Sequence, residues 1–329
     1  GYNVSCKNAS DGFIEIEVTG GTGEYTYNWS NGTSSEDMDG LTAGTYSLTV
    51  TDENNCTESI LVELTEPDEG LEYNITQSDY TGFGVSCFGD ENGWIEVEIE
   101  GGVGEYTYTW STGDGGSNLD NLSAGTYSLD VEDENGCAIT IEVEVTQPDA
   151  VIISESHSDF NGYGISGCIE GDGWINTDVS GGTGNYTYFW DTGDTTPNLE
   201  GLGAGSYTLF VSDENGCTNS INVELTEPDE LTVEVTWVDY NGYGVSCFGE
   251  NDGYISVVPY GGTGLYTYTW TNGIISQELA NTQNAFIFSN VSAGTYLVTT
   301  TDANGCFHEA EVVITEPEEL VVTIDISQY

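Results

Sequence analysis

Cysteines are the residues of this sequence whose type and spacing point most clearly to chemistry. The eight of them fall two to a segment in four successive segments of about 80 residues each. An even number at a repeated spacing predicts disulfides and an oxidising, extracytoplasmic location, with one disulfide inside each segment. Zinc is a weaker alternative, because the thiols lack CxxC spacing and regular histidine partners. The expected pairs are Cys6 with Cys56, Cys87 with Cys137, Cys168 with Cys217, and Cys247 with Cys306.

Two sets of aspartates accompany the cysteines. One set follows the first cysteine of each segment, and the other precedes the Asn-containing turn that leads to the second cysteine. If a disulfide drew these two acidic turns together, they would offer the several oxygen ligands that Ca²⁺ prefers. The alternative is that Asp, Asn and Gly simply form the turns. The candidate calcium ligands are Asp11, Asp90, Asp172 and Asp252 in the first set, and Asp52, Asp133, Asp213 and Asp302 in the second.

The charge balance excludes whole classes of function. The chain has 57 acidic residues against a single Lys or Arg, for a formal net charge of −56. A nucleic-acid partner is excluded, because neutralising phosphates requires Lys or Arg. Binding to anionic membrane surfaces is disfavoured for the same reason, and no apolar run is long enough for membrane insertion.

The elements that must position these residues are β-strands. In the second segment, alternating apolar residues predict strands at 71–80, 94–99, 106–110, 121–123, 126–133 and 138–146. Short alternating strands between turn signals are typical of an antiparallel sandwich. The expected fold class is all-β: tandem immunoglobulin-like antiparallel β-sandwich domains with one disulfide each. The expected domains are 1–66 (without its first strand), 67–147, 148–227 and 228–316, with 317–329 as the first strand of a following repeat.

The fourth segment is longer than the others between its Trp and the next Tyr motif. The extra residues lie near 274–290 and include Phe286, Ile287 and Phe288. We expect them to add a strand to the sheet, because exposed apolar loops are uncommon without a partner.

Aromatic residues form two further patterns. A Tyr-x-Tyr-x-Trp motif ending at Trp29, Trp110, Trp190 and Trp270 has the period of a buried strand face, so we expect core rather than a carbohydrate-stacking platform. Trp94 and Trp174 are out of phase with the apolar positions of their strand. They are therefore predicted to face outward, as candidates for a ligand platform.

Catalysis finds little support in the sequence. The two histidines, His157 and His308, occupy non-equivalent positions in their segments. No set of nucleophile, histidine and acid recurs from segment to segment. We therefore expect no enzyme activity.

The recurring motifs resemble a known family. Ser-Cys-x-Gly-acidic, Gly-Gly-x-Gly-x-Tyr-Thr-Tyr-x-Trp, Leu-x-Ala-Gly-Thr-Tyr and Asp-x-Asn-Gly-Cys are similar to the SprB-type repeat of surface adhesins of Bacteroidetes, which include the mobile gliding adhesin. The resemblance implies secretion to the cell surface, usually through the type IX system, attachment through parts of a longer protein, and long filaments. Residue Lys7 after the first cysteine and Ile169 after the fifth depart from the pattern, which affects the local turn and not the module.

These observations predict a non-enzymatic structural segment of an extracellular adhesin or filament. Its partners are the neighbouring repeats of the same long chain, with surface glycans or other cells as further candidates. The alternatives are an array of glycan-binding modules and a non-catalytic spacer of a large secreted enzyme. The sequence begins and ends in mid-repeat, which we interpret as a segment of a longer array. A second interpretation is that the tail pairs with the first domain of another molecule, as in donor-strand filaments.

Overall fold

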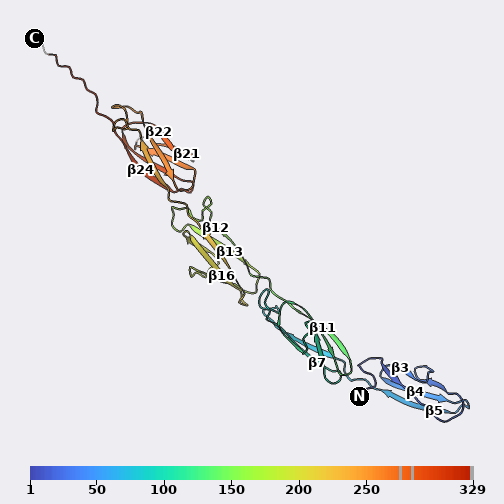
Figure 1. Ribbon diagram of the computed structural model, residues 1–329. Coiled ribbons are helices and arrows are strands. Elements are labelled where there is room, and N and C mark those ends of the chain that lie inside the picture. Colours follow the sequence, from blue (N-terminus) through green and yellow to red (C-terminus); the bar gives the residue numbers. More distant parts are fainter. Residues whose placement is uncertain (274–275, 283–284, 327–329) are drawn as a thin grey trace. The chain divides into compact units, whose positions relative to one another are not determined.

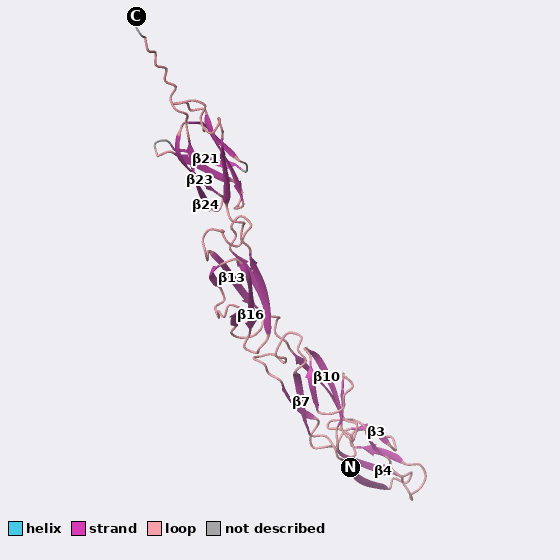
Figure 2. Cartoon of the chain, turned by 60° about the vertical axis from the view of Figure 1, so that its left-hand side comes forward, coloured by secondary structure: helices cyan, strands magenta, loops and turns pink. Residues whose placement is uncertain are grey.

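A computed structural model describes residues 1–273, 276–282 and 285–326 of the chain. These residues form strands, turns and loops, and none of them lies in a helix (Figure 2). The described part of the chain accordingly contains no helix with the length and apolar character needed to cross a membrane. The all-β fold class is confirmed.

The chain divides into two compact units. The first contains residues 1–150 with 181–184 and 213–217, and the second contains 151–180, 185–212 and 218–329. Within these units the sheets follow the four repeats, and Figure 1 labels some of their strands.

The second repeat shows the arrangement most completely. One sheet has the order β6-β7-β9 and the other β11-β10-β8, all antiparallel. This division of strands is that of an immunoglobulin-like sandwich, in which two layers bury their facing side chains. The strands are β6 (Glu72–Gln77), β7 (Gly93–Glu100), β8 (Thr107–Trp110), β9 (Asn118–Leu122), β10 (Gly125–Glu132) and β11 (Ala138–Val145).

The same two sheets recur in the other repeats. In the third repeat they are β12-β13-β15 and β14-β16-β17, and in the first they are β1-β3 and β2-β4-β5. The third repeat comprises β12 (Ile152–His157), β13 (Gly173–Ser180), β14 (Thr187–Trp190), β15 (Leu199–Leu202), β16 (Gly205–Ser212) and β17 (Thr218–Leu225). The first comprises β1 (Gly12–Ile14), β2 (Thr26–Trp29), β3 (Met38–Leu41), β4 (Gly44–Thr51) and β5 (Thr57–Leu64).

The fourth repeat adds a strand, as its longer sequence predicts. Strand β21 pairs with β20 and extends one sheet to the order β21-β20-β23-β24. Residues 286–288 belong to β22, which pairs with β19 as β9 pairs with β7, so they are part of the common frame rather than of the insertion. The strands are β18 (Thr232–Trp237), β19 (Gly253–Tyr260), β20 (Tyr266–Thr271), β21 (Ser276–Thr282), β22 (Phe286–Val291), β23 (Gly294–Thr301) and β24 (Phe307–Ile314). Residues 274–275 and 283–284 of the predicted insertion lie outside the described residues.

Each core is built around the tryptophan that ends the Tyr-x-Tyr-x-Trp motif. Trp110 is buried among Ile95, Leu129 and Ile141, and its Nε1 donates to Gly116 O at 2.8 Å. Because burying an unpaired indole N–H would be costly, the loop after β8 folds over the ring to accept it. The predicted core role of these tryptophans is confirmed.

A second hydrogen bond fixes the corner before β10. Tyr127 OH donates to Ser123 O at 2.9 Å, which resembles the tyrosine corner of immunoglobulin-like folds. The equivalent bonds run from Tyr46 to Thr42, from Tyr207 to Gly203 and from Tyr296 to Ser292. The Ala-Gly-Thr-Tyr motif is therefore a structural signature of this corner.

Candidate functional site

The disulfides join consecutive repeats, which corrects the pairing expected from the sequence. Each bond links the first cysteine of one repeat to the second cysteine of the next, with Cα–Cα distances of 5.3–5.6 Å. Cys56 and Cys247 are free and exposed. The expected bond inside each repeat, including Cys6–Cys56 and Cys247–Cys306, is therefore wrong. The bonds are Cys6–Cys137, Cys87–Cys217 and Cys168–Cys306.

The reason lies in the direction of the strands. Cys87 precedes β7, whereas the turn that carries Cys137 lies beside Val103, which follows β7. An eight-residue strand spans roughly 25 Å at about 3.4 Å per residue. A disulfide requires Cα atoms within about 7 Å of each other. The two cysteines of one repeat thus lie at opposite ends of the sandwich and cannot bond to each other.

The second cysteine of each repeat is carried by a rigid hairpin turn, which we call the plug (residues 52–56, 133–137, 213–217 and 302–306). In the second repeat, Asp133 Oδ1 accepts from Asn135 N and Cys137 N, both at 2.9 Å, and its Oδ2 accepts from Val103 N at 2.9 Å. Gly136 has a φ of 83°, a conformation that favours glycine. The plug is therefore held by hydrogen bonds to the Asp133 carboxylate within its own repeat.

The first cysteine of each repeat lies in a loop that we call the socket (residues 2–8, 80–89, 160–168 and 240–249). Asn215 of a plug reaches into a socket, where its Nδ2 donates to Tyr80 O at 3.1 Å and to Ser86 O at 3.2 Å. Asn304 makes the same pair of bonds to Phe160 O and Ser166 O, and Asn135 donates to Ser5 O. Each joint thus combines a disulfide with hydrogen bonds from an asparagine side chain of the plug to backbone carbonyl groups of the socket.

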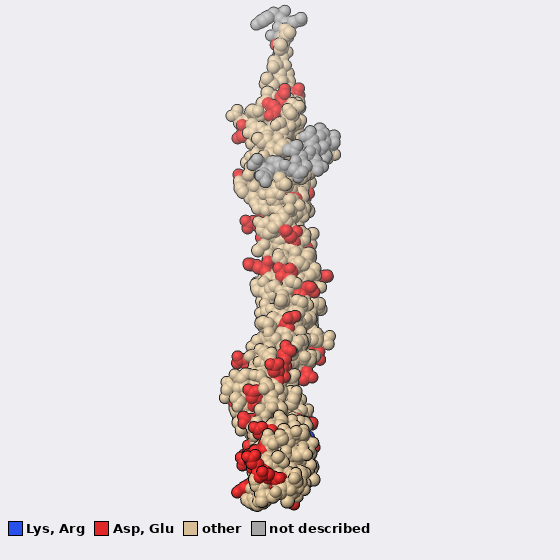
Figure 3. Space-filling model, turned by 90° about the vertical axis from the view of Figure 1, so that its right-hand side faces the viewer, with Lys and Arg blue, Asp and Glu red and all other residues tan. Residues whose placement is uncertain are grey.

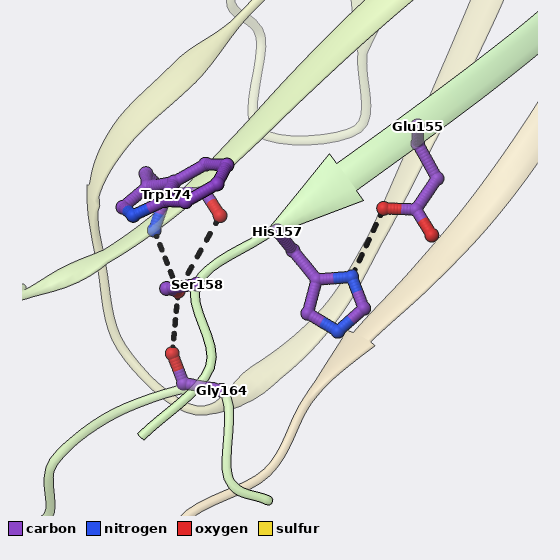
Figure 4. A network of polar contacts seen from close by, with 5 residues as sticks. All are labelled: Glu155, His157, Ser158, Gly164 and Trp174. Atoms are coloured by element: carbon purple, nitrogen blue, oxygen red, sulfur yellow. Dashed lines mark hydrogen bonds and ion pairs between the residues drawn. The ribbon is translucent and has the colours of Figure 1, made fainter. Parts of the chain in front are cut away.

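A buried serine shapes the socket of the third repeat (Figure 4). Ser158 Oγ donates to Gly164 O at 2.6 Å and accepts from Trp174 N at 3.0 Å, so it ties both ends of the loop to β13. Ser78 makes the same contacts in the second repeat. Because the buried serine hydroxyl forms hydrogen bonds to the backbone at Gly164 and Trp174, it holds the socket loop in the conformation that presents its carbonyl groups to the plug.

The Thr-(Glu/Gln)-Pro linker also holds the socket, a role that sequence reasoning missed. Gln147 Oε1 accepts from Gly89 N at 2.9 Å, and Glu316 Oε2 accepts from Gly249 N at 2.7 Å. In the first repeat Glu66 accepts from Lys7 Nζ at 2.8 Å and from Asn8 N, and these bonds lower the pKa of Glu66. The recurrence of an acid or amide before each proline was the available signal.

The predicted calcium ligands do not converge within a repeat. Asp133, Asp213 and Asp302 are buried in their plugs, and they and Asp52 accept backbone N–H groups there. Hydrogen bonds from Ser5 and Ser246 in the sockets lower the pKa of Asp11 and of Asp252, respectively. Asp172 accepts from Ser166 N, and Asp90 from Ser86 Oγ. No group of three or more His, Cys, Asp or Glu residues suited to a metal occurs in the described part of the chain.

The outward aromatic residues occupy the second position of the equivalent strands β1, β7, β13 and β19. Trp94 is 37% exposed and Trp174 is half-buried, while Phe13 and Tyr254 at the equivalent sites are exposed. A bulge at Gly93/Trp94 turns the indole outward, and a Cβ on Gly93 would lie 2.9 Å from Leu122 O. Their use as a ligand platform stays a prediction.

The serine, histidine and glutamate seen together in Figure 4 do not form a nucleophilic set. Ser158 is buried and its hydroxyl is engaged with main-chain atoms, whereas His157 Nδ1 lies 3.0 Å from Glu155 Oε2. A reacting serine would need its hydroxyl on the histidine.

Comparison with known families agrees with the motif pattern. The family model of the SprB repeat matches residues 2–34, 85–115 and 245–273. These three regions are therefore similar to the SprB repeat. They contain the cysteine-bearing part of the socket and the two strands that follow it in the first, second and fourth repeats, which are β1–β2, β7–β8 and β19–β20.

Several solved structures of adhesion proteins share the repeated sandwich only loosely. A tetra-tandem repeat in the extending region of a large adhesion protein is 14% identical, with 89% of this chain and 91% of that chain covered and a TM-score of 0.30. The eight N-terminal immunoglobulin domains of Down Syndrome Cell Adhesion Molecule are 10% identical, with 94% of this chain and 58% of that chain covered and a TM-score of 0.27. These scores are too low for either likeness to bear on function. The comparison with curated proteins found no match.

Proposed function

We propose that this chain is a non-enzymatic, length-building segment of an extracellular adhesin, in which disulfides lock each repeat to the next. The observation that carries the proposal is the pairing of cysteines across joints rather than inside domains. A bond inside a domain would stabilise one core. A bond between domains restricts how two neighbours move, which is the property a stalk needs.

The surface supports this role. Acidic side chains are scattered over the face shown in Figure 3, and one lysine is the sole counter-charge among 329 residues. Such a surface keeps a chain soluble and suppresses lateral association through self-repulsion. The similarity to the SprB repeat favours placement at a cell surface, with neighbouring repeats of one long chain as the first partners.

Removing the three disulfides while leaving the cores intact tests the proposal. Small-angle X-ray scattering should compare the oxidised wild-type chain with a variant in which the six bonded cysteines are serine. We expect unchanged strand content by circular dichroism but a broader distribution of interatomic distances in the variant. Identical scattering curves would refute the view that the disulfides restrict the joints.

A glycan-binding array remains the second candidate because of the outward-facing Trp94. A glycan array with wild-type chain and with Trp94→Ala/Trp174→Ala would reveal it, since stacking requires the indole rings. Binding that survives both substitutions would place recognition elsewhere.

A further inference from the structure

The outer face of one sheet in the third repeat carries a pair of exposed aromatic side chains. Phe189 on β14 and Phe210 on β16 stand opposite each other in the strand register. Phe189 is 54% exposed and Phe210 is 49% exposed. Residues directly opposite each other on antiparallel strands share a face and have Cβ atoms about 5 Å apart. The two rings therefore belong to one apolar patch on the surface of the sheet.

The aromatic pair is specific to the third repeat. The tryptophan that follows the first member of the pair is common to all four repeats, and Trp190 is buried in the core as Trp110 is. The common fold therefore does not require aromatic side chains at the two outer positions. The equivalent pairs in the first, second and fourth repeats are Asn28 with Thr49, Thr109 with Asp130, and Thr269 with Thr299.

The face around the pair also has fewer carboxylates than its counterpart in the second repeat. Three acidic positions of that repeat are neutral in the third: Asp130, Glu132 and Glu142 correspond to Phe210, Ser212 and Asn222. The chain as a whole has a net charge of −56, so an anionic partner is repelled and a cationic partner is drawn to the acidic faces of other repeats. A face that has lost acids and gained aromatic rings therefore suits an uncharged partner.

Neutral hydrogen-bonding groups border the aromatic pair. Asn222 Nδ2 donates to Ser206 Oγ at 2.8 Å and to Thr208 Oγ1 at 3.0 Å, which fixes an amide and two hydroxyls on the same face. Ser220 stands opposite Phe210 on the next strand. The electron-rich faces of the phenylalanine rings attract weakly positive C–H groups. A sugar ring presents both C–H groups and hydroxyls, so it matches the rings and the polar border together.

The size of the face argues against a protein partner. Its three strands of at most eight residues cover roughly 400 Å², at about 4.8 Å between strands and about 3.4 Å per residue. A stable protein complex typically buries about 800 Å² on each side. A second copy of this chain would in addition bring a second set of acidic residues close to the first.

We propose that the outer face of β14, β16 and β17 binds an uncharged oligosaccharide. Phe189 and Phe210 form the stacking platform, and Ser206, Thr208 and Asn222 bind the sugar hydroxyls. The site is separate from Trp174, which lies on β13 in the other sheet of the same repeat. It adds a ligand to the proposed stalk and does not depend on the disulfides between repeats.

Native electrophoresis of the whole chain, through gels that contain a dissolved polysaccharide, tests the proposal. The neutral probes are galactomannan, xyloglucan, dextran and soluble starch, and the anionic probe is alginate. We expect at least one neutral probe to retard the wild-type chain and alginate to leave its mobility unchanged. A chain that none of the neutral probes retards, or that alginate alone retards, would overturn the proposal.

A variant that copies the fourth repeat identifies the site. Phe189→Thr/Phe210→Thr introduces the residues of the Thr269–Thr299 pair without adding charge, and it should weaken binding to the retarding polysaccharide by about tenfold or more. Trp94→Ala/Trp174→Ala is the matched control and should change the affinity by less than about twofold. Circular dichroism should show the same strand content in both variants. Equal affinities of wild type and the phenylalanine variant would overturn the proposal.

Two other results would assign the pair a different role. A lower melting temperature of the phenylalanine variant with undiminished polysaccharide binding would make the pair a cross-strand contact that only stabilises the sheet. A wild-type dimer in sedimentation experiments that the same variant abolishes would make the face an interface between copies of the chain. Either result would overturn the oligosaccharide site. Neither bears on the scattering comparison that tests the proposed stalk.

Discussion

Mechanical extension gives the sharpest prediction, because disulfides across joints bypass most of the chain. Cys6 and Cys306 are separated by about 300 residues, or roughly 105 nm when extended at about 3.5 Å per residue. With the observed bonds, the shortest covalent path crosses from Cys6 to Cys137, follows the chain to Cys168 and crosses to Cys306. That path contains about 30 residues, or roughly 11 nm.

Optical tweezers with handles at the two termini can measure the length of this shortest path, because it limits the contour length reached at high force. We call this limit the ceiling. The terminal stretches outside Cys6 and Cys306 add the same length in every variant. We expect roughly 11 nm between these cysteines when oxidised, and roughly 105 nm after reduction. Bonds inside each repeat would instead leave about 90 residues extensible, or roughly 32 nm.

Two double variants separate the possibilities further. Cys6→Ser/Cys137→Ser should raise the ceiling to about 130 residues, or roughly 45 nm, because the path must then run through Cys87–Cys217. Cys87→Ser/Cys217→Ser is the matched control and should leave the ceiling unchanged, because the shortest path does not use that bond. A rise of the ceiling in the control variant would refute the pairing across joints.

Three further predictions concern the joints and their carboxylates. Asn304→Ala removes the bonds to Phe160 O and Ser166 O, so the Cys168–Cys306 disulfide should be reduced about tenfold more readily in a dithiothreitol titration, while Asn54→Ala should leave it unchanged. Hydrogen bonds from Cys56 N and Thr22 lower the pKa of Asp52. The ionised Asp52 therefore stabilises the folded state above about pH 4, and this stabilisation is lost as the pH falls through the lowered pKa of the folded state. The difference in melting temperature between wild type and Asp52→Asn should accordingly disappear below the lowered pKa. If the acidic turns hold calcium, EDTA should lower the melting temperature, and an unchanged melting curve would remove that prediction.

The strands and the cores could be predicted from the sequence because both depend on local periodicity. Apolar residues alternate along β7 and β11, and the motif ending at Trp110 repeats four times. The extra strand of the fourth repeat could also be predicted from the additional length of that repeat, although the apolar residues 286–288 that suggested it lie in β22 of the common frame. These predictions depend on the residues within one repeat and not on which parts of neighbouring repeats meet at a joint.

The disulfide partners could not be read so directly, because they depend on how many times the chain crosses the sandwich. Four strands lie between Cys87 and Cys137, and a simple reversal from each strand to the next would return the chain to its starting end. The loop at 111–117 takes the place of a strand, so β8 and β9 run in the same direction. The chain therefore reaches Cys137 at the far end. The presence of two cysteines at corresponding positions of every repeat concealed this, because the pattern fits bonding inside a repeat as well as bonding between repeats.

The position of the disulfides also separates the stability of a repeat from the stiffness of a joint. The core of the second repeat lies between its two sheets, and neither Cys87 nor Cys137 belongs to it. Breaking the bonds should therefore release the joints before it melts the sandwiches. In the chain-entropy account, a disulfide that closes a loop of about 130 residues contributes roughly 5 kcal/mol to the free energy of unfolding when both repeats unfold. Much of this contribution is absent when the repeats stay folded, because the linker already holds their ends together. When the repeats stay folded, the disulfide therefore mainly restricts the rotation of one repeat against the next. A length-building segment requires this restriction in order to stay extended.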